Sequence, residues 1–248
     1  MRICELLEAE LPITRDAPGR ASTRDYISKI ADKKLGGGHF ATAYAMPGDV
    51  AHVKKIARIN NEAWDQDGFY NYLEKIKNLS HFVYLPQILE IQRLESTLGE
   101  PYLLVSMERL TGARDMTKDE LIIVLEHIID HELTQEERDD YGHGSLTQTI
   151  SSLLKSYVRG KPLHEVNPLA PQGLAIRDLE LIKSLKIVKN LCQLGFDDDL
   201  HKENYMFRRT KFGPQLVLTD PLSFRTSDPI KLRMINPKQG EMYGIVNK

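Results

Sequence analysis

The sequence predicts an α+β protein with two lobes: an N-terminal antiparallel sheet with one helix, then a reduced and mainly helical C-terminal lobe. Three observations predict this order. Between residues 29 and 110 the chain carries short apolar runs with strand-like alternation and a single helical pattern. From residue 115 to residue 194 helical patterns dominate. A polar loop and one apolar strand follow, so that strands and helices are segregated along the chain.

The N-terminal lobe is expected to span residues 29–110, after a short helix and a linker in residues 1–28. A helix is predicted at residues 66–77, because the apolar residues between Phe69 and Ile76 would share one face. The expected strands span residues 40–45, 52–59, 87–94 and 102–107.

The C-terminal lobe is expected to be a minimal one, residues 111–248. Thr117-x-x-Glu120 and Thr134-x-x-Glu137 are capping boxes, which mark the starts of helices. Further elements are predicted as helices at residues 121–129, 146–158 and 176–194, and as a strand at residues 215–219.

Composition narrows the class of protein. The formal net charge is -2, with 33 Lys and Arg against 35 Asp and Glu. The chain as a whole therefore has no strong electrostatic field with which to bind nucleic acid or an anionic membrane. The basic pairs at Lys54-Lys55 and Arg208-Arg209 are expected to be ordinary surface charge. Two distant cysteines favour a reducing compartment, and no apolar run approaches a membrane span. We expect a soluble, cytoplasmic protein with neither a membrane nor a nucleic acid as direct partner.

A glycine run is the first candidate for chemistry. Glycines between strands let backbone N–H groups approach phosphate oxygens, although such a run can also be only a flexible turn. Ala43 follows on the next strand. The candidate nucleotide-binding residues here are Leu35, Gly36, Gly37, Gly38, His39, Phe40 and Ala43.

Lys55 is the second candidate. It lies on the strand after the glycine run, where a lysine can reach bound phosphates as a point charge. Strand alternation places Val53 and Lys55 on one face and Lys54 on the other, which favours Lys55 as the ligand and Val53 as an apolar contact to the base. The alternative is that both lysines are exposed strand residues.

The strongest pattern is Asp-x-x-x-x-Asn followed by an apolar strand that ends in Asp. Phosphoryl transfer needs a carboxylate to accept the proton of the attacking hydroxyl, and oxygen ligands for Mg²⁺. Asp199 suits the first role, while Asn204 and Asp220 suit the second. Together with the glycine run and Lys55, in that order, the pattern predicts an ATP- and Mg²⁺-dependent phosphotransferase.

These motifs resemble those of the protein-kinase fold. The resemblance is most detailed to the early protein kinase of autographivirus-type short-tailed lytic phages, and covers about two-thirds of the chain. It rests on three stretches, residues 35–44, 199–207 and 219–224. It implies a serine/threonine kinase, made early in infection, that modifies host proteins and itself in the host cytoplasm.

The resemblance implies further nucleotide contacts. Met107 would lie at the back of the adenine pocket, the backbone of Glu108 and Leu110 would contact the edge of the base, and Met206 would follow the catalytic loop. An acidic residue should pair with Lys55, and the sequence leaves three candidates open. These are Glu74, which is slightly favoured, Asp67 and Glu62.

The chain departs from the usual kinase pattern at several positions. Ala41 replaces a glycine, and Asp197-Asp198 replaces the usual His-Arg, which removes the usual partner of an activation-loop phosphate. Pro221 follows Asp220, and because proline fixes its own φ it disfavours a large flip of this segment. We therefore expect a minimal kinase that is constitutively active or switched by a partner.

Two other functions fit part of the pattern. A small-molecule phosphotransferase of the aminoglycoside or choline type shares Asp-x-His-x-x-Asn, which includes His201, although a loop-orienting role for His201 is also expected. An acidic cleft would favour that function, and its candidates are Glu136, Glu137, Asp139 and Asp140. The other alternative is a pseudokinase that binds a partner without chemistry.

Overall fold

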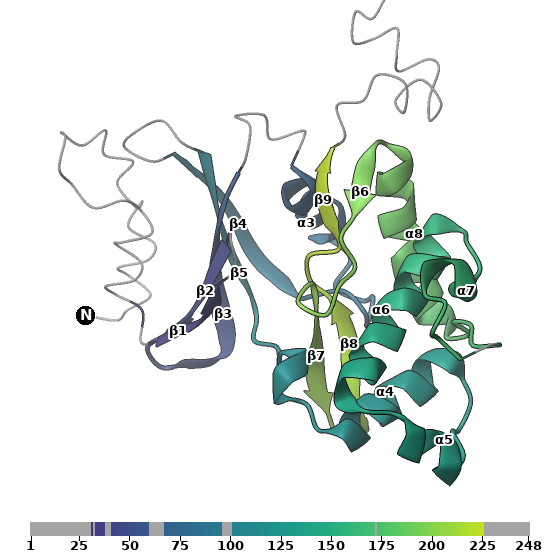
Figure 1. Cartoon of the computed structure of the whole chain (residues 1–248). Helices are drawn as coiled ribbons and strands as arrows, with labels where there is room; N and C mark the ends of the chain where they lie inside the picture. The colour runs from purple at the N-terminus through teal and green to yellow at the C-terminus, as the bar shows by residue number, and fades with distance from the viewer. Residues whose placement is uncertain are drawn as a thin grey trace, which may run out of the picture. The chain divides into compact units, whose positions relative to one another are not determined.

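The computed structural model describes residues 31, 33–37, 41–59, 67–95, 101–171 and 173–225 (Figure 1). The helix and linker expected in residues 1–28 lie outside these ranges. So do Gly38, His39, Phe40 and Glu62, which were candidates for the site. None of the helices in the described ranges combines the length and the apolar character that a membrane crossing requires.

The α+β architecture predicted from the sequence is confirmed: an antiparallel sheet comes first, and a mainly helical part follows. The contacts divide the chain into two compact units. The first contains the five strands of the sheet, and the second contains the helix between the third and fourth strands together with everything from Leu110 onward.

The first unit is a five-stranded antiparallel sheet with the strand order β1-β2-β3-β5-β4. All four predicted strands are present, and β1 is an additional strand that includes Gly36 and Gly37. The strands are β1 (Lys33–Gly37), β2 (Ala41–Met46), β3 (Asp49–Arg58), β4 (Ile88–Glu95) and β5 (Pro101–Glu108).

The two faces of this sheet differ. One face carries a small apolar cluster, which consists of Tyr44, Ile56, Leu94 and Leu104. Residues alternate between faces along each strand, so Lys55, one residue before Ile56, belongs to the opposite face. The predicted separation of Lys55 from Lys54 by strand alternation is therefore confirmed.

The second unit contains the helices. The three long helices predicted from the sequence are present, and α8 begins at Leu179 because the side chain of Asp178 caps it by accepting from the Leu181 N–H at 2.8 Å. The helical elements are α3 (Gly68–Ile76), η2 (Ala113–Asp115), α4 (Lys118–Ile129), α5 (Gln135–Asp140), α6 (His143–Arg159), α7 (Leu163–Val166) and α8 (Leu179–Gln193).

Both predicted capping boxes are formed. At the start of α4 the Thr117 hydroxyl accepts from the Glu120 N–H at 3.2 Å, and the Glu120 carboxylate accepts from the Thr117 N–H at 2.8 Å. Thr134 and Glu137 make the same pair of bonds at the start of α5. The four-residue pattern thus located two helix starts correctly.

Four short strands complete the second unit. They form two antiparallel pairs, β6 (Phe196–Asp198) with β9 (Leu222–Arg225), and β7 (Tyr205–Thr210) with β8 (Gly213–Leu218). Only β8 corresponds to the strand predicted at residues 215–219. A loop is expected from the sequence in the region of β7, whereas the structure forms a strand in which Tyr205 and Phe207 alternate with more exposed residues in the period-2 manner. Gly213, with φ 112°, ends the turn between β7 and β8.

The core of the second unit lies between α4, α6, α8 and the β7–β8 pair. Fully buried leucines and isoleucines on α6 follow the spacing i, i+4, i+7 and i+8, which places them on one face of the helix. They are Leu146, Ile150, Leu153 and Leu154. The β7–β8 pair contributes Phe207 and Val217, which are also fully buried. This core holds the two segments that carry the candidate catalytic residues.

Candidate active site

The loop of residues 199–204, between β6 and β7, is closed by hydrogen bonds from one side chain. Nδ2 of Asn204 donates to the main-chain oxygen and to carboxylate Oδ2 of Asp199, in both cases at 2.8 Å. The Asn204 N–H donates to the carbonyl of His201 at 2.9 Å. Leu200 is fully buried and anchors the loop in the core. The two ends of the predicted Asp-x-x-x-x-Asn pattern are therefore in direct contact.

Asp220 joins this loop through the main chain. The N–H groups of Thr219 and Asp220 both donate to the carbonyl oxygen of Asn204 at 3.1 Å. In the other direction, the Asp199 N–H donates to the carbonyl oxygen of Pro221 at 2.8 Å. The structure thus brings together Asp199, Asn204 and Asp220, the three residues that the sequence assigns to phosphoryl transfer.

His201 orients the loop. Its Nδ1 accepts from the Glu203 N–H at 3.2 Å, which requires an unprotonated Nδ1 and so places the proton of the neutral ring on Nε2. Nε2 faces carboxylate Oδ1 of Asp199 at 3.4 Å. The imidazole and the Asn204 amide therefore approach the two oxygens of the same carboxylate from different positions.

The oxygen donors of this cluster fit Mg²⁺. Asn204 uses Nδ2 for Asp199, so Oδ1 is the atom of its amide that could bind a cation, and Asp220 offers a carboxylate. In the described part of the chain, no three His, Cys, Asp or Glu side chains are grouped to enclose a metal. Such a sparse set suits Mg²⁺, which is commonly bound by one or two protein side chains together with substrate phosphates.

The first unit holds the second group of candidate residues. Lys55 lies opposite Ala43 on β2 and Val105 on β5, and Val53 lies opposite Met107. Small or apolar side chains therefore surround Lys55 on its face of the sheet. Lys54, on the other face, contacts the Ser106 hydroxyl and lies 3.6 Å from the Glu90 carboxylate. The Lys54 side chain therefore makes polar contacts with neighbouring strands of the sheet.

The remaining nucleotide-binding candidates are placed as follows. Leu35 is half-buried on β1, Met107 is buried on β5, and Glu108 is the last residue of β5. The next residue, Arg109, donates its N–H to the carbonyl of Ala51 at 2.7 Å, which continues the sheet pairing. Leu110 and Met206 belong to the second unit, where both are partly exposed.

Two of the three candidates for the acidic partner of Lys55 lie on or next to α3. Glu74 forms an ion pair with Lys77 at 2.7 Å, one turn further along the chain. Asp67 is buried and caps the helix, accepting from the Tyr70 N–H at 2.8 Å. The assignment of this partner stays a prediction.

Sequence reasoning missed the residue that pairs with Asp198. Arg159, the last residue of α6, makes a bidentate ion pair with Asp198, with Nε–Oδ2 at 2.8 Å and Nη2–Oδ1 at 3.1 Å. The hydrogen bond to Asp198 raises the pKa of Arg159. Burial and the negative charge of Asp198 raise the pKa of the nearby Cys192 thiol to about 12, so Cys192 is not a reactive thiolate. Arg159 and Asp198 are 39 residues apart, and no rule of sequence spacing connects residues at that separation.

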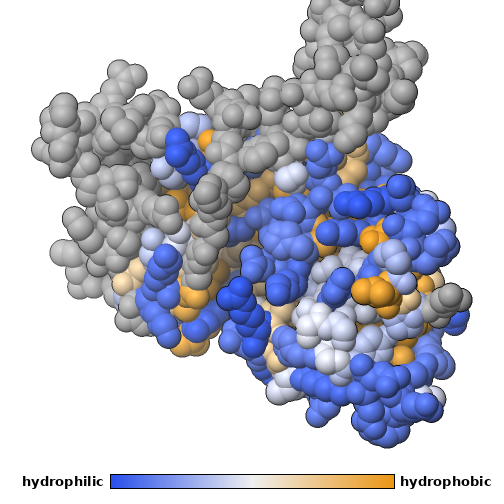
Figure 2. Space-filling model, in the orientation of Figure 1, coloured by the Kyte–Doolittle hydropathy of each residue, from blue (hydrophilic) through white to orange (hydrophobic). Residues whose placement is uncertain are grey.

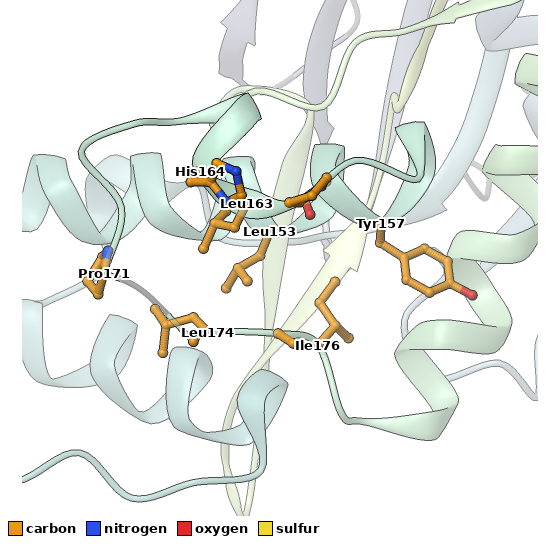
Figure 3. Close-up of a pocket in the computed structure, with 11 residues that line it drawn as sticks. Leu153, Tyr157, Leu163, His164, Pro171, Leu174 and Ile176 are labelled. Atoms are coloured by element: carbon orange, nitrogen blue, oxygen red, sulfur yellow. The ribbon is translucent and has the colours of Figure 1, made fainter.

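A cavity of about 720 Å³ lies between α6, α7 and the segment that leads into α8 (Figure 3). Leu153, Leu163, Leu174 and Ile176 line it, Ser156, Tyr157 and His164 supply polar groups, and none of the described lining residues carries a carboxylate. The acidic residues of α5 do not contribute to it. None of the residues of α5 is buried. In the view of Figure 2, the coloured surface of the molecule is mainly hydrophilic, and apolar residues gather only in small patches.

Comparisons with known proteins identify no family for this chain. No family model and no curated protein matches it. Among solved structures, similar ones include aminoglycoside phosphotransferase APH(4)-Ia, with 12% identity, a TM-score of 0.32, and coverage of 89% of this chain and 83% of that one. A thermostable mutant of that enzyme has the same identity and TM-score, at 86% and 80% coverage. Choline kinase LicA from Streptococcus pneumoniae has 12% identity and a TM-score of 0.31, at 89% and 76% coverage. The case for a function comes from the site's own residues.

Proposed function

We propose that this protein is an ATP-dependent serine/threonine protein kinase. The observation that carries the proposal is the contact network of Asp199, Asn204 and Asp220. It joins a carboxylate that could act as a base to two oxygen ligands, which is the combination that phosphoryl transfer requires.

Each residue would have a distinct role. Asn204 and Asp220 would hold Mg²⁺, which when bound neutralises charge on the phosphates. Asp199 would orient the acceptor hydroxyl and take its proton, with its carboxylate held by Asn204 and His201. Lys55 and the backbone of the glycine run would bind the phosphates of ATP, and Val53, Ala43 and Met107 would contact the base. Catalysis would rest on positioning and charge neutralisation.

One observation favours protein acceptors. The motifs at residues 35–44, 199–207 and 219–224 resemble those of early phage protein kinases, which implies host proteins and the kinase itself as substrates, in the host cytoplasm.

The test is transfer of labelled γ-phosphate from Mg·ATP by the purified protein, with and without host-cell lysate. We expect label on the protein itself or on discrete lysate proteins, with phosphoserine or phosphothreonine after hydrolysis. Asp199→Ala should lose the label while keeping its thermal unfolding transition. Binding of Mg·ATP without any transfer would instead indicate a pseudokinase, and loss of both would reject a nucleotide site.

A small-molecule phosphotransferase is the second candidate, and His201 favours it. Its ring contacts the carboxylate of Asp199 within the Asp-x-His-x-x-Asn pattern that such enzymes share. A panel of aminoglycosides and amino alcohols separates the two functions. Turnover of one of them, faster than any protein labelling, would decide for the small acceptor.

A further inference from the structure

The segment that carries Asp220 is contacted by α3 on both sides of that residue (Figure 1). Before Asp220, the Tyr72 hydroxyl donates to the carbonyl oxygen of Leu218 at 2.7 Å. After Asp220, Gly68 lies directly against the backbone of Ser223. Asp220 therefore lies between two points at which α3 holds the main chain.

Gly68 is required by the close approach of α3 to β9. A Cβ atom at this position would lie 1.9 Å from the carbonyl oxygen and 2.8 Å from the carbonyl carbon of Ser223. Both distances are far shorter than van der Waals contact at roughly 3.5 Å. Because the obstacle is backbone, no rotation of a side chain could relieve it. Any residue other than glycine would push α3 and β9 apart.

Tyr72 provides the second contact from inside the core. Its side chain is completely buried, and burial together with the charge of Asp220 raises the pKa of its phenol well above the ordinary value. The hydroxyl therefore stays protonated and remains a donor. The same Leu218 donates its N–H to the carbonyl of Tyr84 at 2.9 Å, so both polar groups of the Leu218 backbone are held.

We propose that α3 positions the magnesium ligand Asp220, with Gly68 and Tyr72 as the positioning residues. The proposal rests on the proposed function, since it takes Asp220 as a ligand of Mg²⁺. The main chain at Asp220 is bonded to Asn204 through its N–H group, and on either side of it Leu218 is hydrogen-bonded to Tyr72 and Ser223 packs against Gly68. These contacts restrict movement of the Asp220 segment, so metal affinity would depend on a helix that contributes no ligand.

The first test compares two glycine-to-alanine substitutions. Gly68 is the first residue of α3, and Gly144 is the second residue of α6, where an added Cβ meets no atom within 4 Å. Alanine has the higher helix propensity at both sites, so propensity alone predicts no loss in either variant. We expect Gly68→Ala to weaken binding of Mn²⁺·ATP by about tenfold, the size typical of disturbed outer contacts of a metal site. Gly144→Ala should bind as the wild type does.

The second test removes single hydroxyl groups, in case Gly68→Ala fails to fold. Tyr72→Phe deletes the bond to Leu218, whereas Tyr84→Phe deletes the hydroxyl of another buried tyrosine, which donates to Asp178 at 2.6 Å. Both variants should lose thermal stability. Only Tyr72→Phe should weaken Mn²⁺·ATP binding and raise the Mg²⁺ concentration needed for half-maximal phosphate transfer.

Electron paramagnetic resonance of Mn²⁺ measures binding, and amide hydrogen exchange over residues 216–223 reports movement of the segment. Weaker metal binding and faster exchange in Tyr72→Phe, and in Gly68→Ala where that variant folds, but in neither control, would support the positioning role. Unchanged metal binding and exchange in Tyr72→Phe would overturn it. Wild-type protein that binds Mn²⁺·ATP but transfers no phosphate would overturn only the proposed function, because binding and exchange still test the role of α3.

Discussion

The two units of the molecule place their candidate residues by different means. In the first unit, Lys55, Val53 and Ala43 are aligned by the register of an antiparallel sheet, and their order on one face follows from alternation. In the second unit, Asp199, Asn204 and Asp220 are joined by a network of side-chain and main-chain hydrogen bonds. The sheet positions a row of residues, whereas the network positions individual atoms.

This difference predicts in which unit substitutions should change the activity most. A sheet residue can be replaced without moving its neighbours, because the ladder is held by backbone groups. Replacing Asp199 or Asn204, in contrast, removes a side-chain hydrogen bond on which the other residue depends. We therefore expect effects on activity in the second unit to be larger and more closely coupled than in the first.

The largest expected effect is that of Asp220→Ala. Loss of the metal ligand should lower phosphate transfer by on the order of 10³-fold, the scale of removing one preorganised electrostatic group. Since the main-chain bonds of Asp220 and Thr219 to Asn204 remain available, the fold should be kept. Labelled transfer and thermal unfolding measure the two effects, with Asp140→Ala on the exposed helix α5 as control. Full activity of Asp220→Ala would refute its assignment.

The next effect distinguishes neighbouring lysines of the first unit. Lys55→Met should reduce transfer by about 10²-fold and weaken ATP binding, because a charge that binds phosphates is lost. Lys54→Met removes only the contacts to Ser106 and Glu90 on the other face, so its activity should change less than about twofold. Steady-state rates over a range of ATP concentrations test the pair, and a larger loss in Lys54→Met would assign the phosphate contact to Lys54 instead of Lys55.

A moderate effect is expected for the ion pair next to Asp199. Arg159→Met leaves Asp198, whose side chain is 11% exposed, without its bidentate partner. Because Arg159 itself is 44% exposed, we expect a loss of about 1 kcal/mol, or a drop of roughly 2–4 °C in Tm. The matched control is Arg114→Met, which breaks a single bond to Glu203 between side chains that are 82% and 59% exposed. Equal losses in both variants would show that the Arg159 pair contributes no more than a surface contact.

The smallest effect concerns the capping box of α4. The Thr117 N–H, with help from Arg209, lowers the pKa of Glu120 below its usual 4.5. A lowered pKa in the folded state stabilises the protein above pH 4.5, and the contribution disappears as the pH falls through the lowered value. Glu120→Gln keeps a hydrogen-bonding cap but does not titrate. The Tm difference between wild type and Glu120→Gln should therefore shrink by about 1–2 °C between about pH 6 and pH 3. A difference that stays constant with pH would contradict this account.

Local chemistry was sufficient to predict much of the fold. Alternating apolar residues predicted four strands of the sheet, and two four-residue capping boxes predicted the starts of α4 and α5. The residue types at Asp199, Asn204 and Asp220 predicted a common site, because carboxylate and amide oxygens at such spacing serve few other purposes. These features depend on neighbouring residues along the chain or on the chemistry of single side chains, so the sequence is enough to predict them.

Other features depend on contacts between distant segments. β6 and β9, with 3 and 4 residues, are too short to stand out in the sequence, and they form because they pair with each other. The pairing of Arg159 with Asp198 joins the end of α6 to β6. The need for glycine at Gly68 arises only where α3 meets the backbone of Ser223. No local pattern encodes such contacts, since they arise only when packing brings distant backbones together.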